Sequence, residues 1–226
     1  MAVLILVGTV HGDPQGYRRT RRLLDKLRPD LVTVEISQFS LRYRKKQRQV
    51  WRRQFQWAQQ HLPAGACSHL ALRRIEAQLA WPFEVQAAED FAQQHGLEWR
   101  PIDTGRLSRG HLRRFWRELL TPDNLRNLLL TEDGDWNQYI AAQYQQARLA
   151  LAQPERLVIP LHRSWSSPEM SGRDKVMAGR LRKLIEAGFR VVHLGGWTHL
   201  VTGLGRPTIG QCLEDLQPQR LLLDQF

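Results

Sequence analysis

Residues 2–7 read AVLILV and stop at Gly8, and residues 31–34 read LVTV and stop at Glu35. Short unbroken runs of leucine and β-branched residues are typical of strands that are covered on both faces, as in a parallel sheet. The polar stretch between the two runs, about residues 14–27, has leucines on one side and predicts a helix. Strand, helix and strand in this order form a βαβ unit, whose ligands gather beyond the carboxyl ends of the strands.

The rest of the chain continues this alternation of helices and strands. We expect helices over residues 38–61, 68–79, 83–95, 171–187 and 209–216, and strands over residues 97–102, 189–194 and 220–223. Residues 105–152 have a helical pattern throughout. The sequence therefore predicts one α/β domain over residues 1–226, with a mostly parallel or mixed central sheet flanked by helices and a helical insertion or cap at about 105–152.

The chain is strongly basic, with 33 lysine and arginine residues against 22 aspartate and glutamate residues and a net charge of +11. A surface of this charge attracts anions of any kind, including nucleic acid. Cationic side chains concentrate in residues 41–53, where aromatic side chains lie between them. We expect this segment either to hold an anionic ligand or to be a solvated helix face whose long cationic stems cover apolar surface.

The two cysteines, Cys67 and Cys212, are too few and too far apart to predict a disulfide framework or a thiolate metal site. No apolar run is long enough to span a bilayer, and residues 1–7 lack the basic start of a signal peptide. We therefore expect a cytoplasmic protein that has no membrane partner.

Two Gly-x-x-His tetrads each follow a predicted strand, Gly8–His11 and Gly196–His199. A glycine just past a strand lets the chain turn sharply, so that the histidine projects over the edge of the sheet. Histidine at such a place can bind a metal or transfer a proton near neutral pH. Glu35 ends another strand at the same edge, which makes the combination more specific than either tetrad alone.

Further polar residues fall near this edge. Glu84 opens a predicted helix, Asp103 ends a strand, and Arg173 lies in the first turn of another predicted helix. A carboxylate there can ligate a metal, orient an imidazole or act as a general base, although Glu84 could equally serve only to stabilise its helix N-terminus. We also expect substrate contacts from Asp103 and from His162 and Arg163, which lie in a predicted loop.

The motifs Leu6–His11 and Pro29–Glu35 resemble the opening of the TraB/TIKI group, and the similarity continues at three later places before it ends at a fourth, Val191–Leu200. The three later motifs are Glu84–Ala88, Ile102-Asp103 and Arg173–Ala178, in the same order as in that group. The group, which includes the TraB/PrgY proteins, belongs to a wider superfamily. That superfamily also contains the erythromycin-esterase-like proteins and the haem-binding ChaN-like proteins.

The resemblance implies an α/β core with one pocket that contains both tetrad histidines and the acidic residues. TIKI-like members are metal-dependent peptidases, esterase-like members use histidine to activate water, and ChaN-like members bind haem. When the site of that group is carried over residue by residue, the first candidates in this chain are His11, Glu35, Glu84 and His199. Arg173 is the next candidate. This chain departs from the TraB-like pattern at Gly172, where a glutamate usually precedes the Arg-Asp pair.

Hydrolysis of an amide or ester bond, in a peptide or another small substrate, is the function we expect. One route uses a divalent transition metal, Mn, Co or Zn, held by His11, Glu35 and His199, which would acidify a bound water. The other route needs no metal, with one histidine as the base and a carboxylate that orients it. Two alternatives remain: a non-enzymatic protein that binds nucleic acid or a haem-like ligand, and a purely structural role for both histidines.

Overall fold

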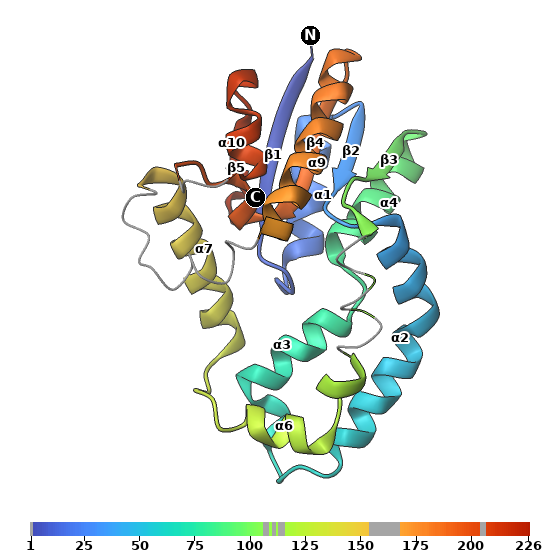
Figure 1. Cartoon of the computed structure of the whole chain (residues 1–226), viewed down its shortest axis with the longest axis vertical. Coiled ribbons are helices and arrows are strands. Elements are labelled where there is room, and N and C mark those ends of the chain that lie inside the picture. The colour runs from blue at the N-terminus through green and yellow to red at the C-terminus, as the bar shows by residue number, and fades with distance from the viewer. Residues whose placement is uncertain (1, 106–108, 110–111, 113–115, 154–167, 204–206) are drawn as a thin grey trace.

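A five-stranded parallel sheet forms the centre of the protein (Figure 1). The computed structural model describes residues 2–105, 109, 112, 116–153, 168–203 and 207–226. The strands are β1 (Val3–Thr9), β2 (Leu31–Val34), β3 (Glu98–Pro101), β4 (Arg190–Gly196) and β5 (Gln219–Leu222), in the order β3-β2-β4-β1-β5. All pairings between these strands are parallel, which confirms the predicted α/β fold and settles the parallel rather than the mixed form.

Both faces of the sheet are covered by helices, which explains the unbroken apolar runs. Leu4 and Leu6 point to one face and pack against α9 (Pro168–Glu186) and α10 (Ile209–Cys212). Ile5 and Val7 point to the other face and pack against α1 (Gly16–Leu27), α4 (Phe83–His95) and α7 (Trp136–Ala152). Because successive side chains of a strand alternate between faces, a strand covered on both faces must be apolar at nearly every position.

The order of the strands brings three polar strand ends together. β4 lies between β1 and β2, with Thr9 opposite Gly196 and Val34 opposite Leu194. The ladder continues past β2, since Glu35 N–H donates to the Leu194 carbonyl. His11, Glu35 and His199 therefore leave neighbouring strands at the same edge, which is where parallel sheets bind their ligands.

A separate group of helices lies beyond the carboxyl ends of the strands (Figure 1). It consists of α2 (Gln38–Gln59), α3 (Leu70–Leu79), α6 (Pro122–Leu128) and residues 112 and 116–120, and we call it the outer helical layer. It has its own apolar core, built around Trp51, Phe55, Leu72 and Trp116. The layer draws on residues 38–79 as well as on the predicted insertion at 105–152, while α7 packs against the sheet instead.

Short 3-10 helices complete the described chain: Ala66–Ser68, η3 (Trp197–Leu200), Glu214–Leu216 and Leu223–Gln225. Helix α4 has the predicted bounds, and Gly96 ends it in the left-handed conformation, with φ of 65°. None of the helices in the described part of the chain is both long and apolar enough to cross a membrane. Cys67 and Cys212 are both free thiols.

Four aromatic side chains of α2 pack in the apolar core of the outer helical layer, Phe39, Tyr43, Trp51 and Phe55, whereas Trp57 is 52% exposed. Phe39 stacks on Tyr43 with 5.4 Å between ring centroids, and Trp51 lies 5.0 Å from Trp116. The cationic side chains of the segment are largely exposed on the opposite side: Arg42, Lys45, Lys46, Arg48, Arg52 and Arg53. The exposed cations match the prediction of a solvated helix face over residues 41–53. Because Tyr43 and Trp51 pack inside the outer helical layer, their rings are not free to stack on nucleic-acid bases.

Tyr144 of α7 holds the turn that carries His11. Its buried hydroxyl donates to Asp13 Oδ2 at 3.0 Å and accepts from Val10 N–H at 3.4 Å. Arg19 Nη1 donates to the same Asp13 oxygen at 2.7 Å. The turn between β1 and α1 is thus tied to α7 through a small buried polar network.

We expect Tyr144→Phe to lower the free energy of unfolding by about 1–2 kcal/mol, because it removes a buried hydrogen bond to a carboxylate. Tyr17→Phe is the matched control, since the Tyr17 hydroxyl donates to Asp90 at 2.7 Å on the surface and its loss should cost about 0.5 kcal/mol or less. Urea unfolding of both variants measures the difference. Equal stabilities of the two variants would contradict the structural role of the Tyr144 network.

Candidate active site

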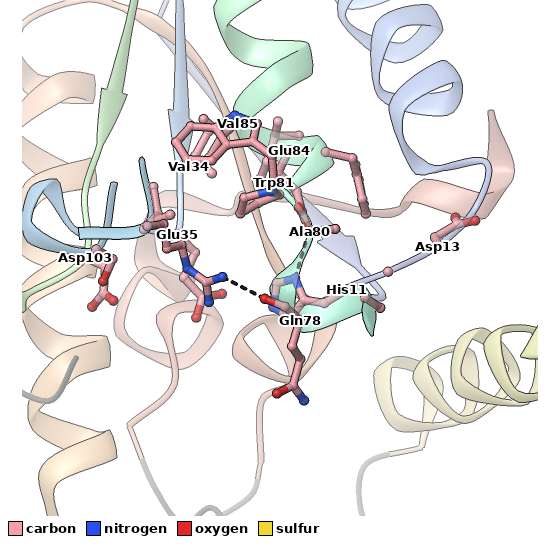
Figure 2. Close-up of a pocket in the computed structure, with 18 of the residues that line it drawn as sticks. His11, Asp13, Val34, Glu35, Gln78, Ala80, Trp81, Glu84, Val85 and Asp103 are labelled. Atoms are coloured by element: carbon pink, nitrogen blue, oxygen red, sulfur yellow. Dashed lines mark hydrogen bonds and ion pairs between the residues drawn. The ribbon is translucent and has the colours of Figure 1, made fainter. Parts of the chain in front are cut away.

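The predicted residues converge on a cavity of about 610 Å³ between the edge of the sheet and the outer helical layer. Figure 2 shows its lining, with Glu35 and Asp103 toward one side, His11 toward the other, and Trp81 and Val85 between them. The cavity is lined by both polar and apolar side chains. Those of the predicted site that line it are His11, Glu35, Glu84, Asp103 and Arg173.

Glu35 is the carboxylate that most groups of the site share. Its Oε1 lies 2.6 Å from Arg173 Nη2 and 3.0 Å from His199 Nε2, and its Oε2 accepts the Gly196 N–H at 2.7 Å. Burial alone would favour the neutral acid, but the charges of His199 and Arg173 outweigh it and hold the pKa of Glu35 well below its usual range. Glu35 is therefore a buried anion with every oxygen engaged.

His199 lies between two carboxylates. On the side opposite Glu35, its Nδ1 forms an ion pair with Asp174 Oδ1 at 2.6 Å. Burial disfavours the imidazolium, yet the charges of Glu35 and Asp174 raise the pKa of His199 to about 9. At neutral pH His199 is a buried cation whose two ring nitrogens both face carboxylates, so it has no lone pair to offer as a base.

His11 differs from His199 because its ring opens into the cavity. Its Nδ1 lies 2.8 Å from Glu84 Oε1 (Figure 2). The same Glu84 oxygen also accepts a hydrogen bond from the Thr9 hydroxyl at 2.8 Å. The His11 side chain is 63% exposed, whereas that of Glu84 is 4% exposed. The surrounding protein disfavours charge on His11, but Glu84 outweighs this effect and raises the pKa of His11 above its ordinary value of 6.5.

The pairing with Glu84 sets the tautomer of His11. Charge on His11 and hydrogen bonds lower the pKa of Glu84 against the opposing effect of burial, so Glu84 is an anion that accepts from Nδ1–H. Neutral His11 then carries its lone pair on Nε2, on the far side of the ring. Glu84 also lies in the first turn of α4, where a helix N-terminus stabilises negative charge.

Arg173, in the first half of α9, forms a two-pronged pair with Asp103. Its Nε donates to Asp103 Oδ1 at 2.7 Å and its Nη2 donates to Asp103 Oδ2 at 3.0 Å, in addition to the bond with Glu35. These two carboxylates raise the pKa of Arg173 despite its burial. Within the described part of the chain, Arg173 Nη1 has no hydrogen-bond partner, and Arg173 is one of the residues that line the cavity.

Gly195 provides the space in which Glu35 approaches β4. A Cβ at this position would lie 2.9 Å from Glu35 Oε2 and 2.9 Å from His193 Nε2, closer than Cβ atoms approach other atoms. His193 is buried below, with Nδ1 3.1 Å from the Thr33 hydroxyl, and burial lowers its pKa to about 4. His193 is therefore neutral at physiological pH and lies beneath the charged layer of the site.

The structure brings most of the predicted site residues together, and it adds others. His162 and Arg163 lie outside the described residues. Gly172 is exposed, and no described atom lies within 4 Å of the place that its Cβ would take. Sequence reasoning did not single out Asp174 and His193, of which only Asp174 carried a signal, since it directly follows Arg173. Thr9 lies within the predicted Gly8–His11 tetrad, and Arg44 lies within the 41–53 segment for which an anionic ligand was one of two predictions.

The arrangement does not suit the divalent metal that we considered. Both nitrogens of His199 face carboxylates, and Glu35 Oε1 already contacts the Arg173 guanidinium, which would repel a cation. Among the described residues, no group of three histidine, cysteine, aspartate or glutamate side chains converges in a way that could hold a metal ion. The metal remains a prediction from the sequence, and the chemistry below uses only the side chains.

No protein-family model matches the chain, and comparisons with curated proteins and with solved structures return no match. The resemblance to the TraB/TIKI group therefore stays a prediction. Function must be argued from the site itself, because many unrelated activities share the α/β architecture.

Gly195→Ala tests the close approach of Glu35. We expect it to lower the free energy of unfolding by about 1–3 kcal/mol, because the added methyl group must displace Glu35 from its partners or shift β4. Gly196→Ala is the matched control, since a Cβ there would meet His11, Glu35 and His199 only at 3.5–3.6 Å, which is ordinary contact. If thermal unfolding finds both variants equally stable, the packing argument is wrong.

The raised pKa of His199 predicts a pH dependence of stability. A histidine whose pKa rises on folding stabilises the protein fully below its unfolded pKa, here 6.5, and loses that contribution as pH rises through about 9. The wild-type free energy of unfolding should therefore fall across this window, by on the order of a few kcal/mol. His199→Gln should be less stable at pH 6.5 and should show a shallower decline, measured by urea unfolding at several pH values. A decline of the same size in the variant would exclude His199 as its source.

Proposed function

We propose that the protein is a hydrolase that cleaves an amide or ester bond at the His11 cavity without needing a metal. The observation that carries this proposal is the pair formed by His11 and Glu84 at 2.8 Å, which leaves His11 Nε2 as the free base in a cavity of about 610 Å³. A histidine held by a buried carboxylate through Nδ1 is the arrangement that general-base catalysis needs.

The reaction follows from the positions of the charged groups. His11 Nε2 removes a proton from a water molecule, the resulting hydroxide adds to the carbonyl carbon, and the carbonyl π electrons move to oxygen. Arg173 Nη1 donates a hydrogen bond to this oxyanion. When the tetrahedral intermediate collapses, the bond to the leaving nitrogen or oxygen breaks, and His11 returns the proton to the leaving group. Glu84 keeps the imidazole in the required tautomer and stabilises its charged form.

His199 and Glu35 have a different role in this proposal. His199 is already a cation and Glu35 is saturated with donors, so neither exchanges protons readily at neutral pH. Glu35 holds Arg173 in place and compensates its charge, while His199 holds Glu35. The alternatives with nucleic acid or a haem-like ligand gain no support from the described contacts, and they stay predictions.

We expect His11→Ala to reduce the rate of hydrolysis of p-nitrophenyl esters and anilides by roughly 10²–10⁴-fold, the usual contribution of a general base. His61→Ala is the matched control, because His61 is exposed just beyond the end of α2, where its ring contacts Trp57. Purified wild type, His11→Ala and His61→Ala are compared under the same conditions. Hydrolysis that persists in His11→Ala at the wild-type rate would contradict the proposal.

The pH profile adds a second readout. Wild-type kcat/KM should rise with pH as His11 loses its proton, at a pKa above 6.5. Because Glu84 raises that pKa, Glu84→Gln should move the rise to lower pH while reducing the maximum rate. An unchanged profile in Glu84→Gln would mean that His11 is not the titrating base.

A further inference from the structure

A second cavity, of about 390 Å³, lies on the other side of His11. The two cavities share four lining residues, His11, Arg44, Ala77 and Gln78, so His11 faces both. The sheet side of the second cavity is formed by the end of β1, Gly196 and η3, and its opposite side by side chains of α2, α3 and α7.

The two cavities differ in charge. The lining of the first cavity contains four carboxylates, Asp13, Glu35, Glu84 and Asp103, as well as Arg44, Arg173 and His11, beside the apolar side chains around Trp81. The lining of the second cavity contains no carboxylate, but it contains two arginines and two histidines: Arg44, Arg74, His11 and His199. A concave site with cations and no anion of its own attracts a negatively charged group.

Neither arginine of the second cavity is neutralised within the described chain. Arg44 Nη1 donates to the Gln78 carbonyl at 2.7 Å and forms no ion pair with a described carboxylate. Burial lowers the pKa of Arg44, and the charge of Glu84 offsets this only in part. Arg74 lies with its guanidinium carbon 5.4 Å from the centroid of the Tyr139 ring and is likewise without a described carboxylate partner.

Arg73, next to Arg74 in the sequence, differs from it because it has a carboxylate partner. Arg73 donates to Glu76 Oε2 at 3.0 Å and does not line either cavity. The guanidinium groups of Arg44 and Arg74 thus remain available for a ligand, and guanidinium groups bind carboxylate and phosphate oxygens through charge-assisted hydrogen bonds.

We infer that the second cavity binds an anionic group of the substrate, a carboxylate or a phosphate, through Arg44 and Arg74. This inference rests on the proposed function: the scissile bond lies over His11, an apolar group of the substrate occupies the first cavity beside Trp81, and the anionic group occupies the second. An N-acylated amino acid, or an ester with an acidic group on its far side, has this chemistry.

Binding is tested first, independently of turnover. Isothermal titration compares N-benzoylglycinate with the neutral N-benzoylglycinamide, and benzyl phosphate with benzyl alcohol. We expect the wild type to bind the anion of at least one pair about tenfold more tightly than its neutral analogue. The pair that shows the preference identifies the group as carboxylate or phosphate, and the preference should weaken as salt is added.

Variants assign the preference to the cavity. Arg44→Gln and Arg74→Gln should each reduce the preference for the anion several-fold, whereas Arg73→Gln should retain it. Arg74 is exposed, so its variant keeps the test valid if Arg44→Gln fails to fold. Equal binding of charged and neutral probes by the wild type would overturn the inference, as would an equal loss in Arg73→Gln.

Hydrolysis separates this inference from the proposed function. Phenylacetyl esters of glycolate and of glycolamide differ only in the charge of the alcohol side. If both are cleaved equally and in a His11-dependent manner, the anion site is wrong and the hydrolase stands. If the anion-selective, arginine-dependent binding is found without His11-dependent cleavage, the anion site stands and the hydrolase is wrong.

Discussion

The site depends on one buried carboxylate, that of Glu35. Two cations, Arg173 and His199, and one backbone N–H group reach it from α9, η3 and β4, so a residue that follows β2 is joined to three consecutive elements that lie far away in the sequence. Such a charge is stable in a protein interior only when it is paired and its oxygens are saturated, and removal of one partner leaves the others uncompensated. Gly195 makes this possible, because any larger residue would occupy the space of the carboxylate.

The same network gives the two tetrad histidines different protonation states and different roles. They follow equivalent strand ends, yet His199 is enclosed between Glu35 and Asp174 and stays protonated, whereas His11 contacts one carboxylate and opens into a cavity. The number of carboxylates around each ring thus decides which histidine is a fixed charge and which is a base. Environments that push the pKa values of similar groups apart are how proteins assign acid and base roles.

Much of the fold could be predicted, because strands such as β1 and β4 are apolar at nearly every position and helix α4 has a clear glycine stop. The strand-end positions of His11, Glu35 and His199 could also be predicted, since parallel strands bring their carboxyl ends to one edge. Which other side chains reach the site depends on the rotation of each helix about its own axis. Arg44 is one cation among many on α2, and only the packing of that helix distinguishes it from its neighbours.

The sequence also could not predict how the helices of the outer helical layer pack against one another. The stripe that contains Trp51 and Phe55 is visible in the sequence, but its partners, such as Leu72 and Trp116, belong to segments separated by long stretches of chain. A pattern of spacing identifies an apolar helix face without identifying what covers it. The charge asymmetry between the two cavities is likewise a property of the assembled structure, because the residues that line each one come from at least four elements.

The place of β1 in the sheet has a consequence for biosynthesis. β1 pairs with β4 on one side and with β5 on the other, so both of its hydrogen-bonding edges wait for strands that are synthesised after β2 and β3. Until Arg190–Gly196 emerges, an apolar strand with two open edges is exposed to every other nascent chain nearby. Such long-range pairing slows folding and favours aggregation. Helices α1 and α4 precede β4 in the chain, so their packing against Ile5 and Val7 is the contact that can shelter β1 before its partner strands are made.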